Sequence, residues 1–120
     1  MATRARIGIK LADERVKSIY HHWDGYPEWL GEKLKKYDTE EKIHELMSHG
    51  DISCIESKTD WNGNELETPI ILSYKMRGED CPAIYHFSVN WWKHTYRNSG
   101  IEWLYLFENG EWHCYSTKER

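Results

Sequence analysis

The N-terminal part of the chain alternates between apolar and polar positions in two short runs. Residues 6–11 place Ile7, Ile9 and Leu11 on one face, and residues 16–21 alternate again after a polar break. A period of two residues is that of a β-strand with one buried face. The pattern therefore predicts an N-terminal β-hairpin.

After the hairpin the apolar period lengthens to that of a helix. Pro27 suits a first helical turn, because its missing N–H would have no partner there. Leu30, Leu34 and Tyr37 then follow on one face. These positions predict a first helix that begins at Pro27.

A second helix is predicted by the start signal Asp38-Thr39-Glu40-Glu41. Asp38 is placed to cap the helix and Glu41 to reach back to its first turn. The apolar stripe and the closing glycine follow as Ile43, Leu46, Met47 and Gly50.

The middle of the chain has weaker signals. Residues 51–66 are polar, contain Asn62-Gly63 and show no sustained period, which predicts a loop. Residues 68–76 alternate and residues 83–87 are rich in strand-forming side chains, with a turn at 77–80 between them. We expect two strands here.

A third helix is predicted between a capping Ser88 and an end marked by Asn98 and Gly100. Its inner face consists of Val89, Trp92 and Tyr96. Adjacent helix positions differ by about 100°, so an inward Trp92 directs its neighbour Trp91 outward.

The last twenty residues give the strongest local signal. Residues 101–107 and 112–116 are aromatic-rich and flank Asn109-Gly110, a pair favoured in two-residue hairpin turns. The resulting order is ββααββαββ, which lacks the strand–helix alternation of a parallel sheet. We therefore expect one α+β domain over residues 1–120, with an antiparallel sheet built from hairpins and helices on one face.

Charge and composition narrow the classes of function. The 120 residues include 16 basic and 20 acidic side chains, and the formal net charge of −4 has the wrong sign for affinity to duplex phosphates. The charge is also too small and too evenly spread for a DNA mimic. No apolar run has the length of a signal peptide or a membrane span, so we expect a soluble cytoplasmic protein that binds neither membrane nor duplex nucleic acid.

Metal and cofactor chemistry is weakly indicated. The three cysteines, at positions 54, 81 and 114, contain no C-x-x-C pair, and neither H-x-H nor H-x-x-x-H spacing occurs. The motifs G-x-S-x-G, G-x-G-x-x-G, H-E-x-x-H and the P-loop are also absent. We expect no metal, no cofactor and no catalytic residue.

The stretch SIYHHWDGYPEWLG, residues 18–31, holds much of the candidate chemistry. His22 and Asp24 could act as metal ligands, or as a base with its orienting carboxylate. In the structural alternative, Asp24 bonds the turn backbone and one histidine packs against the following helix. Because neighbours on a strand point to opposite faces, His21 and His22 are not expected to share a site.

Aromatic residues are the second candidate group, with seven Trp and eight Tyr beside two Phe. Trp23, Tyr26 and Trp29 could form a stacking platform, since stacking is worth about 1 to 3 kcal/mol per base. The alternative is that they fill the core. An outward Trp91 would face a ligand or a partner surface.

The run SIYHHWDGYPE, together with the upstream RARIGIK and the terminal YLFENGEWH, resembles a family of small, mostly uncharacterised bacteriophage and prophage proteins. That family combines a strand, an S-I-Y-x-H-W-D-G-Y-P-E core, two short helices and a terminal aromatic hairpin. The resemblance covers the first fifty and the last twenty residues best. Trp29 and Leu30 stand where the family has Gly and a small apolar residue, so a site near the helix start would be reshaped.

The resemblance implies a counter-defence role in the host cell, by sequestering a nucleotide immune signal or by occluding a host defence protein. We expect the chain to bind a small signalling, cyclic nucleotide without cleaving it. The alternatives are a protein-binding inhibitor and a small enzyme with a His–Asp base. Because strand 112–116 is an aromatic edge strand, we also expect a homo-oligomer.

Aromatic faces would stack the base and arginines would contact the phosphates. The residues expected to bind the ligand are His22, Trp23, Asp24, Tyr26, Trp91, Arg97, Arg6 and Arg77, with Arg4 as a further phosphate contact.

Overall fold

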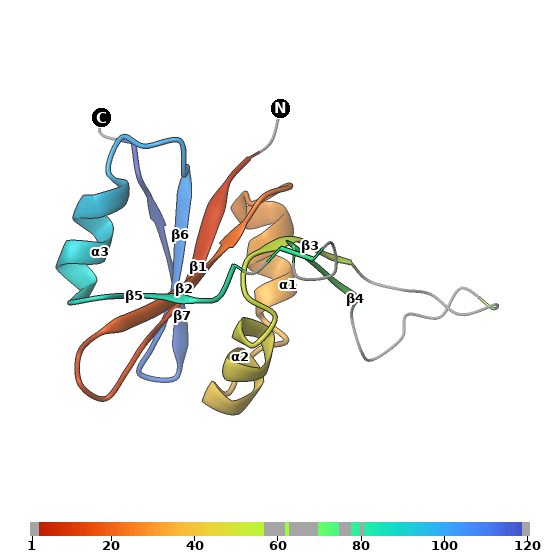
Figure 1. Cartoon of the computed structure of the whole chain (residues 1–120), viewed down its shortest axis with the longest axis horizontal. Coiled ribbons are helices and arrows are strands. Elements are labelled where there is room, and N and C mark those ends of the chain that lie inside the picture. Colours follow the sequence, from red (N-terminus) through yellow and green to blue (C-terminus); the bar gives the residue numbers. More distant parts are fainter. Residues whose placement is uncertain (1–2, 57–61, 63–69, 75–77, 80, 119–120) are drawn as a thin grey trace.

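The computed structural model describes residues 3–56, 62, 70–74, 78–79 and 81–118. In this described part, seven strands form one sheet with helices beside it (Figure 1). The elements in chain order are β1 (Ala5–Lys10), β2 (Val16–His21), the π-helical turn η1 (Pro27–Gly31), α1 (Glu32–Leu34), α2 (Glu40–Met47), β3 (Ile52–Glu56), β4 (Ile70–Ser73), β5 (Ile84–His86), α3 (Val89–Tyr96), β6 (Trp103–Glu108) and β7 (Glu111–Ser116). The α+β class is confirmed.

The sheet is mixed rather than wholly antiparallel. Its strand order is β4-β3-β2-β1-β6-β7, and β5 also pairs with β2. The hairpins β1–β2, β3–β4 and β6–β7 are antiparallel, whereas β1 pairs with β6, and β2 with β3, in parallel. The expectation of an antiparallel sheet was wrong at these two pairings, because each joins strands that are distant in sequence and leaves no hairpin signal.

Strand β3 lies within residues 51–66, where a loop was expected. Its register against β4 shifts between Ile52 and Cys54, so the side-chain alternation is interrupted there. Ile52 and Ile55 are nevertheless both buried. The bulge removes the period of two residues that would have identified the strand, and the rest of this segment, except Asn62, lies outside the described residues.

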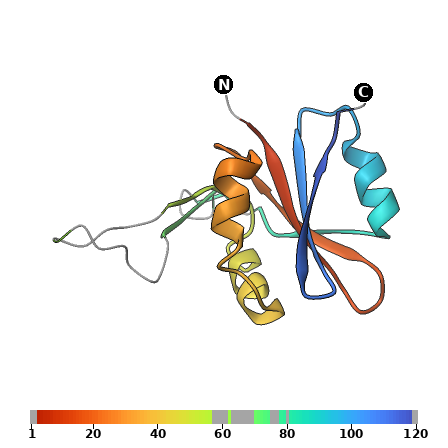
Figure 2. The same ribbon diagram turned by 180° about the vertical axis from the view of Figure 1, so that it is seen from behind.

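Helices cover both faces of the sheet, which corrects the expectation of helices on one face. The side chains of Ala5, Ile7 and Ile9 on β1 pack with those of η1, α1 and α2 in one core. On the other face, Trp92 of α3 packs in a second core with Val16, Leu104 and Leu106. Figures 1 and 2 show α3 on one side of the sheet and α1 and α2 on the other.

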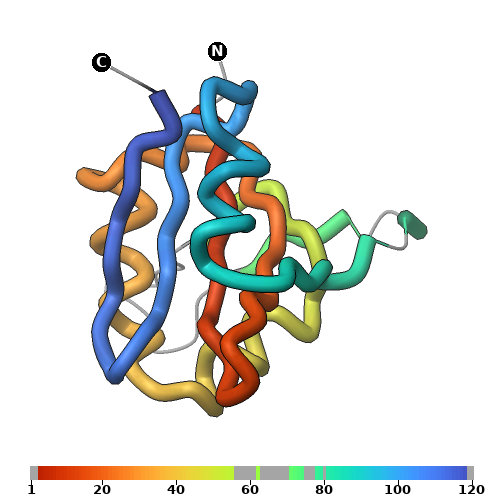
Figure 3. Tube along the Cα trace, turned by 90° about the vertical axis from the view of Figure 1, so that its left-hand side faces the viewer, coloured from red at the N-terminus to blue at the C-terminus, as the bar shows by residue number. Residues whose placement is uncertain are grey.

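Close packing of α3 on the sheet depends on Trp92. This side chain is fully buried, and its indole N–H donates to Ser18 Oγ at 3.2 Å. Ser88 caps the helix by accepting from the N–H of Trp91 at 3.1 Å. The expected cap and the expected inward Trp92 are therefore confirmed, and Figure 3 shows how α3 crosses the sheet.

Helix α2 begins one residue later than its start signal suggested. Thr39 rather than Asp38 is the cap, because the Thr39 hydroxyl accepts from the N–H of Lys42 at 3.3 Å. Asp38 instead forms an ion pair with the Lys42 side chain at 2.9 Å. The predicted buried stripe of this helix is confirmed, and it consists of Ile43, Leu46 and Met47.

The C-terminal hairpin follows its sequence signal. Asn109 and Gly110 both have positive φ, at 53° and 78°, as a two-residue turn of this kind requires. Strand β7 pairs with β6 over its whole length, from Trp103–Ser116 to Glu108–Glu111. In the described part of the chain, no helix has the length and apolar character needed to cross a membrane.

Candidate ligand-binding site

A hollow of about 420 Å³ lies between α3 and the β6–β7 hairpin, and we call it the α3 groove. It is lined by Asn90, Lys93, His94, Arg97, Leu104, Tyr115, Ser116, Thr117 and Lys118. Four of these side chains are basic, and none of the described lining residues is acidic. The groove therefore concentrates positive charge on a chain whose net charge is negative.

One face of α3 supplies the first wall of the groove. Asn90, Lys93 and His94 of α3 follow at positions i, i+3 and i+4, the spacing of a single helix face, and the C-cap residue Arg97 follows at i+7. Trp92 lies on another side of the helix, against the sheet, and these four residues border one hollow together with residues of the hairpin.

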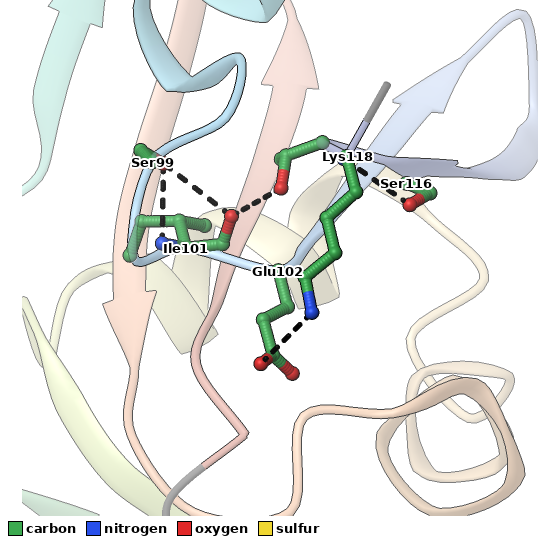
Figure 4. A network of polar contacts seen from close by, with 6 residues as sticks. Ser99, Ile101, Glu102, Ser116 and Lys118 are labelled. Carbon is green, nitrogen blue, oxygen red and sulfur yellow. Dashed lines mark hydrogen bonds and ion pairs between the residues drawn. The ribbon is translucent and has the colours of Figure 1, made fainter. Parts of the chain in front are cut away.

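The second wall is held in place by contacts at the end of β7 (Figure 4). The Thr117 hydroxyl donates to the carbonyl of Ile101, and the N–H of Asn98 donates to the Thr117 carbonyl at 2.8 Å. Lys118 forms an ion pair with Glu102 at 3.7 Å. The residues after β7 are thereby tied to the segment after α3, and Glu102 offsets part of the charge of Lys118.

Lys93 lies against the opposite wall. Its ammonium nitrogen is 3.5 Å from the centre of the Tyr115 ring, a cation–π contact between α3 and β7. This contact holds the positive charge inside the groove rather than out in solvent.

An aromatic surface continues the groove at the start of α3. A second hollow is lined by Phe87, Ser88, Asn90, Trp91 and His94, so it shares Asn90 and His94 with the groove. Phe87 is 81 % exposed and Trp91 56 % exposed, and the Trp91 and His94 rings stack at 5.5 Å. The outward orientation expected for Trp91 is confirmed. We call this surface the aromatic end.

Of the residues expected to bind the ligand, Trp91 and Arg97 therefore border one continuous surface. Arg6 lies elsewhere, on the flank of α3 that faces β2. It is 6 % exposed, donates from Nε to Ser18 Oγ at 2.9 Å, and faces the Tyr96 ring at 5.4 Å.

His22 and Trp23 are in contact with each other, and neither lines the α3 groove. The His22 Nδ1 atom is 2.6 Å from the Tyr20 hydroxyl, and the Trp23 ring meets the His22 ring edge-on at 4.5 Å. Trp23 and Trp29 are 47 % and 48 % exposed, so neither fills the core.

Asp24 and Tyr26 serve the turn that leads into η1. Asp24 is exposed with φ 54°, and the next N–H, of Gly25, donates to Thr3 at 2.8 Å. The Tyr26 carbonyl accepts from the N–H of Leu30 at 3.0 Å in the first turn of η1. Among the described contacts, no hydrogen bond joins Asp24 to His22, and Arg77 lies outside the described residues.

His21 and His22 point to opposite faces, as expected. His21 is 1 % exposed, and its Nδ1 atom has no hydrogen-bond partner among the described residues. Burial, with smaller contributions from Lys33 and His22, lowers the pKa of His21 to about 3, so this ring is neutral. Within the described ranges, no three His, Cys, Asp or Glu side chains are grouped so that they could hold a metal ion.

Sequence reasoning missed several residues of the groove. Lys93 and His94 share the helical spacing of Asn90 and Arg97, so the α3 wall could have been identified from the sequence. Tyr115 and Lys118 could not, because their position depends on where the β6–β7 hairpin lies relative to α3. A comparison of the chain with known protein families, curated proteins and solved structures found no match in any of the three.

Proposed function

We propose that the protein binds a small, phosphate-bearing signalling nucleotide in the α3 groove and holds it without cleaving it. The observation that supports this function is a hollow lined by basic side chains that continues into exposed aromatic rings. A nucleotide has the same two halves, an anionic phosphate group and a planar base. The volume of about 420 Å³ is within the usual range of small-ligand sites.

Different side chains of the groove would contact the phosphate, the base and the sugar of the nucleotide. Arg97 and Lys93 on α3, with Lys118 on the opposite wall, would contact the phosphate oxygens, and the guanidinium can do so with two parallel hydrogen bonds. Trp91 would stack the base at the aromatic end. Asn90 lies between the two ends, where its amide can bond the sugar or a base edge.

The side chains that line the groove support the proposal of binding without turnover. Among its described lining residues, no carboxylate is present to orient the His94 ring as a general base. The Thr117 hydroxyl already donates to the backbone. A bound nucleotide thus meets donors that hold it, but no assembled base and nucleophile.

The resemblance to small phage proteins supplies the biological setting of the proposal. A cytoplasmic protein that binds a nucleotide immune signal and releases it intact only on unfolding lowers the concentration of that signal. The proposed role is therefore sequestration of a host signal as a counter-defence mechanism.

The test combines ligand recovery with calorimetry. Small molecules that co-purify with the protein are released by heat and identified by mass spectrometry, and the identified nucleotide is then titrated into wild type and variants. We expect intact nucleotide, and about a tenfold or greater loss of affinity in Lys93→Gln and Arg97→Gln, since one charged hydrogen bond is worth about 1.5–3 kcal/mol.

Lys35→Gln is the matched control. Lys35 is an exposed lysine paired with Glu32 after α1, and it is not among the residues that line the groove. Its removal changes the net charge equally and should leave affinity unchanged. Recovery of a cleaved nucleotide would favour the enzyme, and unchanged affinity in both groove variants would exclude the α3 groove.

A second candidate function, occlusion of a host defence protein, is favoured by a different observation. Ile84, Tyr85, Phe87 and Trp91 are all between 43 % and 81 % exposed within eight residues of sequence. Exposed aromatic groups of this kind commonly anchor protein interfaces. Tyr85→Ala separates the two functions, because Tyr85 does not line the groove: it should weaken binding to a protein partner and leave nucleotide affinity unchanged.

A further inference from the structure

Arg6 is a buried arginine without a carboxylate partner in the described part of the chain. Its Nε donates to Ser18 Oγ at 2.9 Å and its Nη2 to the Ser18 carbonyl at 3.0 Å. The guanidinium also faces the Tyr96 ring at 5.4 Å. A guanidinium has five N–H donors, so these two bonds leave donors available.

A charge in this position is costly unless an opposite charge lies nearby. Arg6 is 6 % exposed, and burial lowers its pKa, while Tyr96, Asp51 and Tyr20 act in the opposite direction. The Oδ1 atom of Asp51 accepts from the backbone N–H of Tyr20 at 2.9 Å, in the gap on the edge of β2 between β5 and β3. The donor capacity of Arg6 thus remains unmatched within the described chain.

Two further residues near Arg6 on this sheet face, Arg4 and Tyr20, also carry hydrogen-bond donors. The β1–β2 register places Arg6 directly opposite Tyr20, so their side chains leave the same face as a cross-strand pair. Arg4 lies two positions before Arg6, is exposed, and lies near enough to Tyr20 to favour ionisation of its hydroxyl. Burial is the larger influence and raises the pKa of Tyr20, so the hydroxyl keeps its proton at neutral pH.

The hydrogen bond between Tyr20 and His22 can have either group as its donor, and in both cases the pair keeps one further N–H or O–H. If the hydroxyl donates to Nδ1, the neutral His22 ring carries its proton on Nε2. If Nδ1–H donates instead, the Tyr20 O–H is available to a ligand. The 2.6 Å contact therefore presents an N–H or an O–H to a ligand, whichever tautomer is present.

We propose that Arg4, Arg6, Tyr20 and His22 form a second anion site, the Arg6 cluster, which binds a phosphate group. Its donors come from β1, β2 and the residues next to their ends, and a tetrahedral phosphate offers acceptor oxygens in more directions than the planar carboxylate does. The site is independent of the α3 groove, because none of its four residues lines that hollow. The phosphate could be free or part of an organic phosphate, and the exposed Trp23 against His22 would contact the organic part.

The test is a titration followed by ¹⁵N NMR at constant ionic strength. Inorganic phosphate, adenosine monophosphate and acetate are added separately, while the Arg6 Nε–H and the His22 ring nitrogens are observed. We expect saturable shifts of both groups with at least one of the phosphates. A larger affinity for adenosine monophosphate, with a shift of the Trp23 indole N–H, would identify an organic phosphate as the ligand.

Because Arg6 itself is too buried to replace safely, two variants of its neighbours test the site and two further variants serve as controls. Arg4→Gln and Tyr20→Phe should each weaken phosphate binding by about tenfold, a change of about 1.4 kcal/mol. Arg15→Gln, an exposed arginine paired with Asp13, is the control of equal charge, and Lys93→Gln in the groove should also leave the Arg6 and His22 shifts unchanged. The proposal is overturned if neither inorganic phosphate nor adenosine monophosphate gives a saturable shift, if acetate binds as tightly as the phosphates, or if Arg4→Gln and Tyr20→Phe bind like wild type.

Discussion

Gly8 of β1 lies directly beneath α3, and its replacement by alanine tests how that helix is held. A Cβ at this position would lie 3.0 Å from Trp92 Cζ2 and 3.0 Å from Val16 Cγ1. Both neighbours are fully buried, so neither can move into solvent. The alanine methyl would have to push the indole, and α3 with it, away from the sheet.

The expected cost is the difference between two effects. Overpacking of a buried site costs about 1–3 kcal/mol, whereas replacing glycine by alanine within a strand recovers about 0.5–1 kcal/mol of backbone entropy. The net destabilisation therefore lies between about 0 and about 2.5 kcal/mol. For a domain of this size, each 1 kcal/mol corresponds to about 3–6 °C in Tm.

Thermal melting of a double-mutant cycle measures this contact. Trp92→Phe removes the ring atoms that Cβ would meet, so Gly8→Ala should cost at least about 0.5 kcal/mol less in that background. Gly31→Ala is the control, because its Cβ would have only ordinary contacts, 3.7 Å from Tyr105 and 3.8 Å from Pro27. Additive effects in the cycle, or a Gly8→Ala variant more stable than wild type, would refute the reasoning.

Three further predictions concern the exposed side chain of Trp23, the stability of the fold in acid, and the oligomeric state. Because Trp23 is 47 % exposed, Trp23→Ala should change the free energy of unfolding by less than about 1 kcal/mol, and a much earlier melt would show that it is core. The pKa of His21 is lowered to about 3 in the folded chain, compared with about 6.5 in the unfolded chain. Between these values only the unfolded chain binds a proton at His21, so the free energy of unfolding should fall as the pH drops from 6.5 toward 3. A His21→Asn variant should lose that part of the pH dependence in acid titrations followed by circular dichroism. In the described residues β7 pairs only with β6, and we predict a dimer or larger oligomer through this edge; a monomeric mass in light scattering at micromolar concentration would contradict it.

Local sequence signals predicted the elements of this fold well where the deciding contacts are also local. The β1–β2 and β6–β7 hairpins and helix α3 follow their alternation, turn residues and caps. Thr39 and Asp38 show the limit of such signals, since both are good capping residues, but the Lys42 backbone N–H bonds Thr39 while Asp38 pairs with the Lys42 side chain. The start of a helix is then uncertain by one residue.

Non-local pairing could not be predicted from the same signals. Strand β6 lies beside β1 in parallel because α3 carries the chain across one face of the sheet, and no short motif records that crossover. The same crossover places Tyr115 and Lys118 beside α3, which explains why only the helical wall of the groove could be found from sequence. The Arg6–Tyr20 pair is different, because the register of the first hairpin already sets it.

The negative net charge of the chain argues against fewer classes of phosphate-bearing ligand than it first suggests, because the charge is unevenly distributed. The value of −4 is a sum over all 120 residues. Helix α2 contributes three glutamates and one lysine to it, whereas α3 contributes Lys93 and no acidic residue. At physiological ionic strength a charge is screened beyond about 8 Å, so a ligand that fits within the α3 groove responds to the nearby cations rather than to the whole chain. A DNA duplex spans many screening lengths and meets the acidic surfaces as well. The net charge therefore argues against duplex binding and leaves a small phosphate-bearing ligand compatible with this protein.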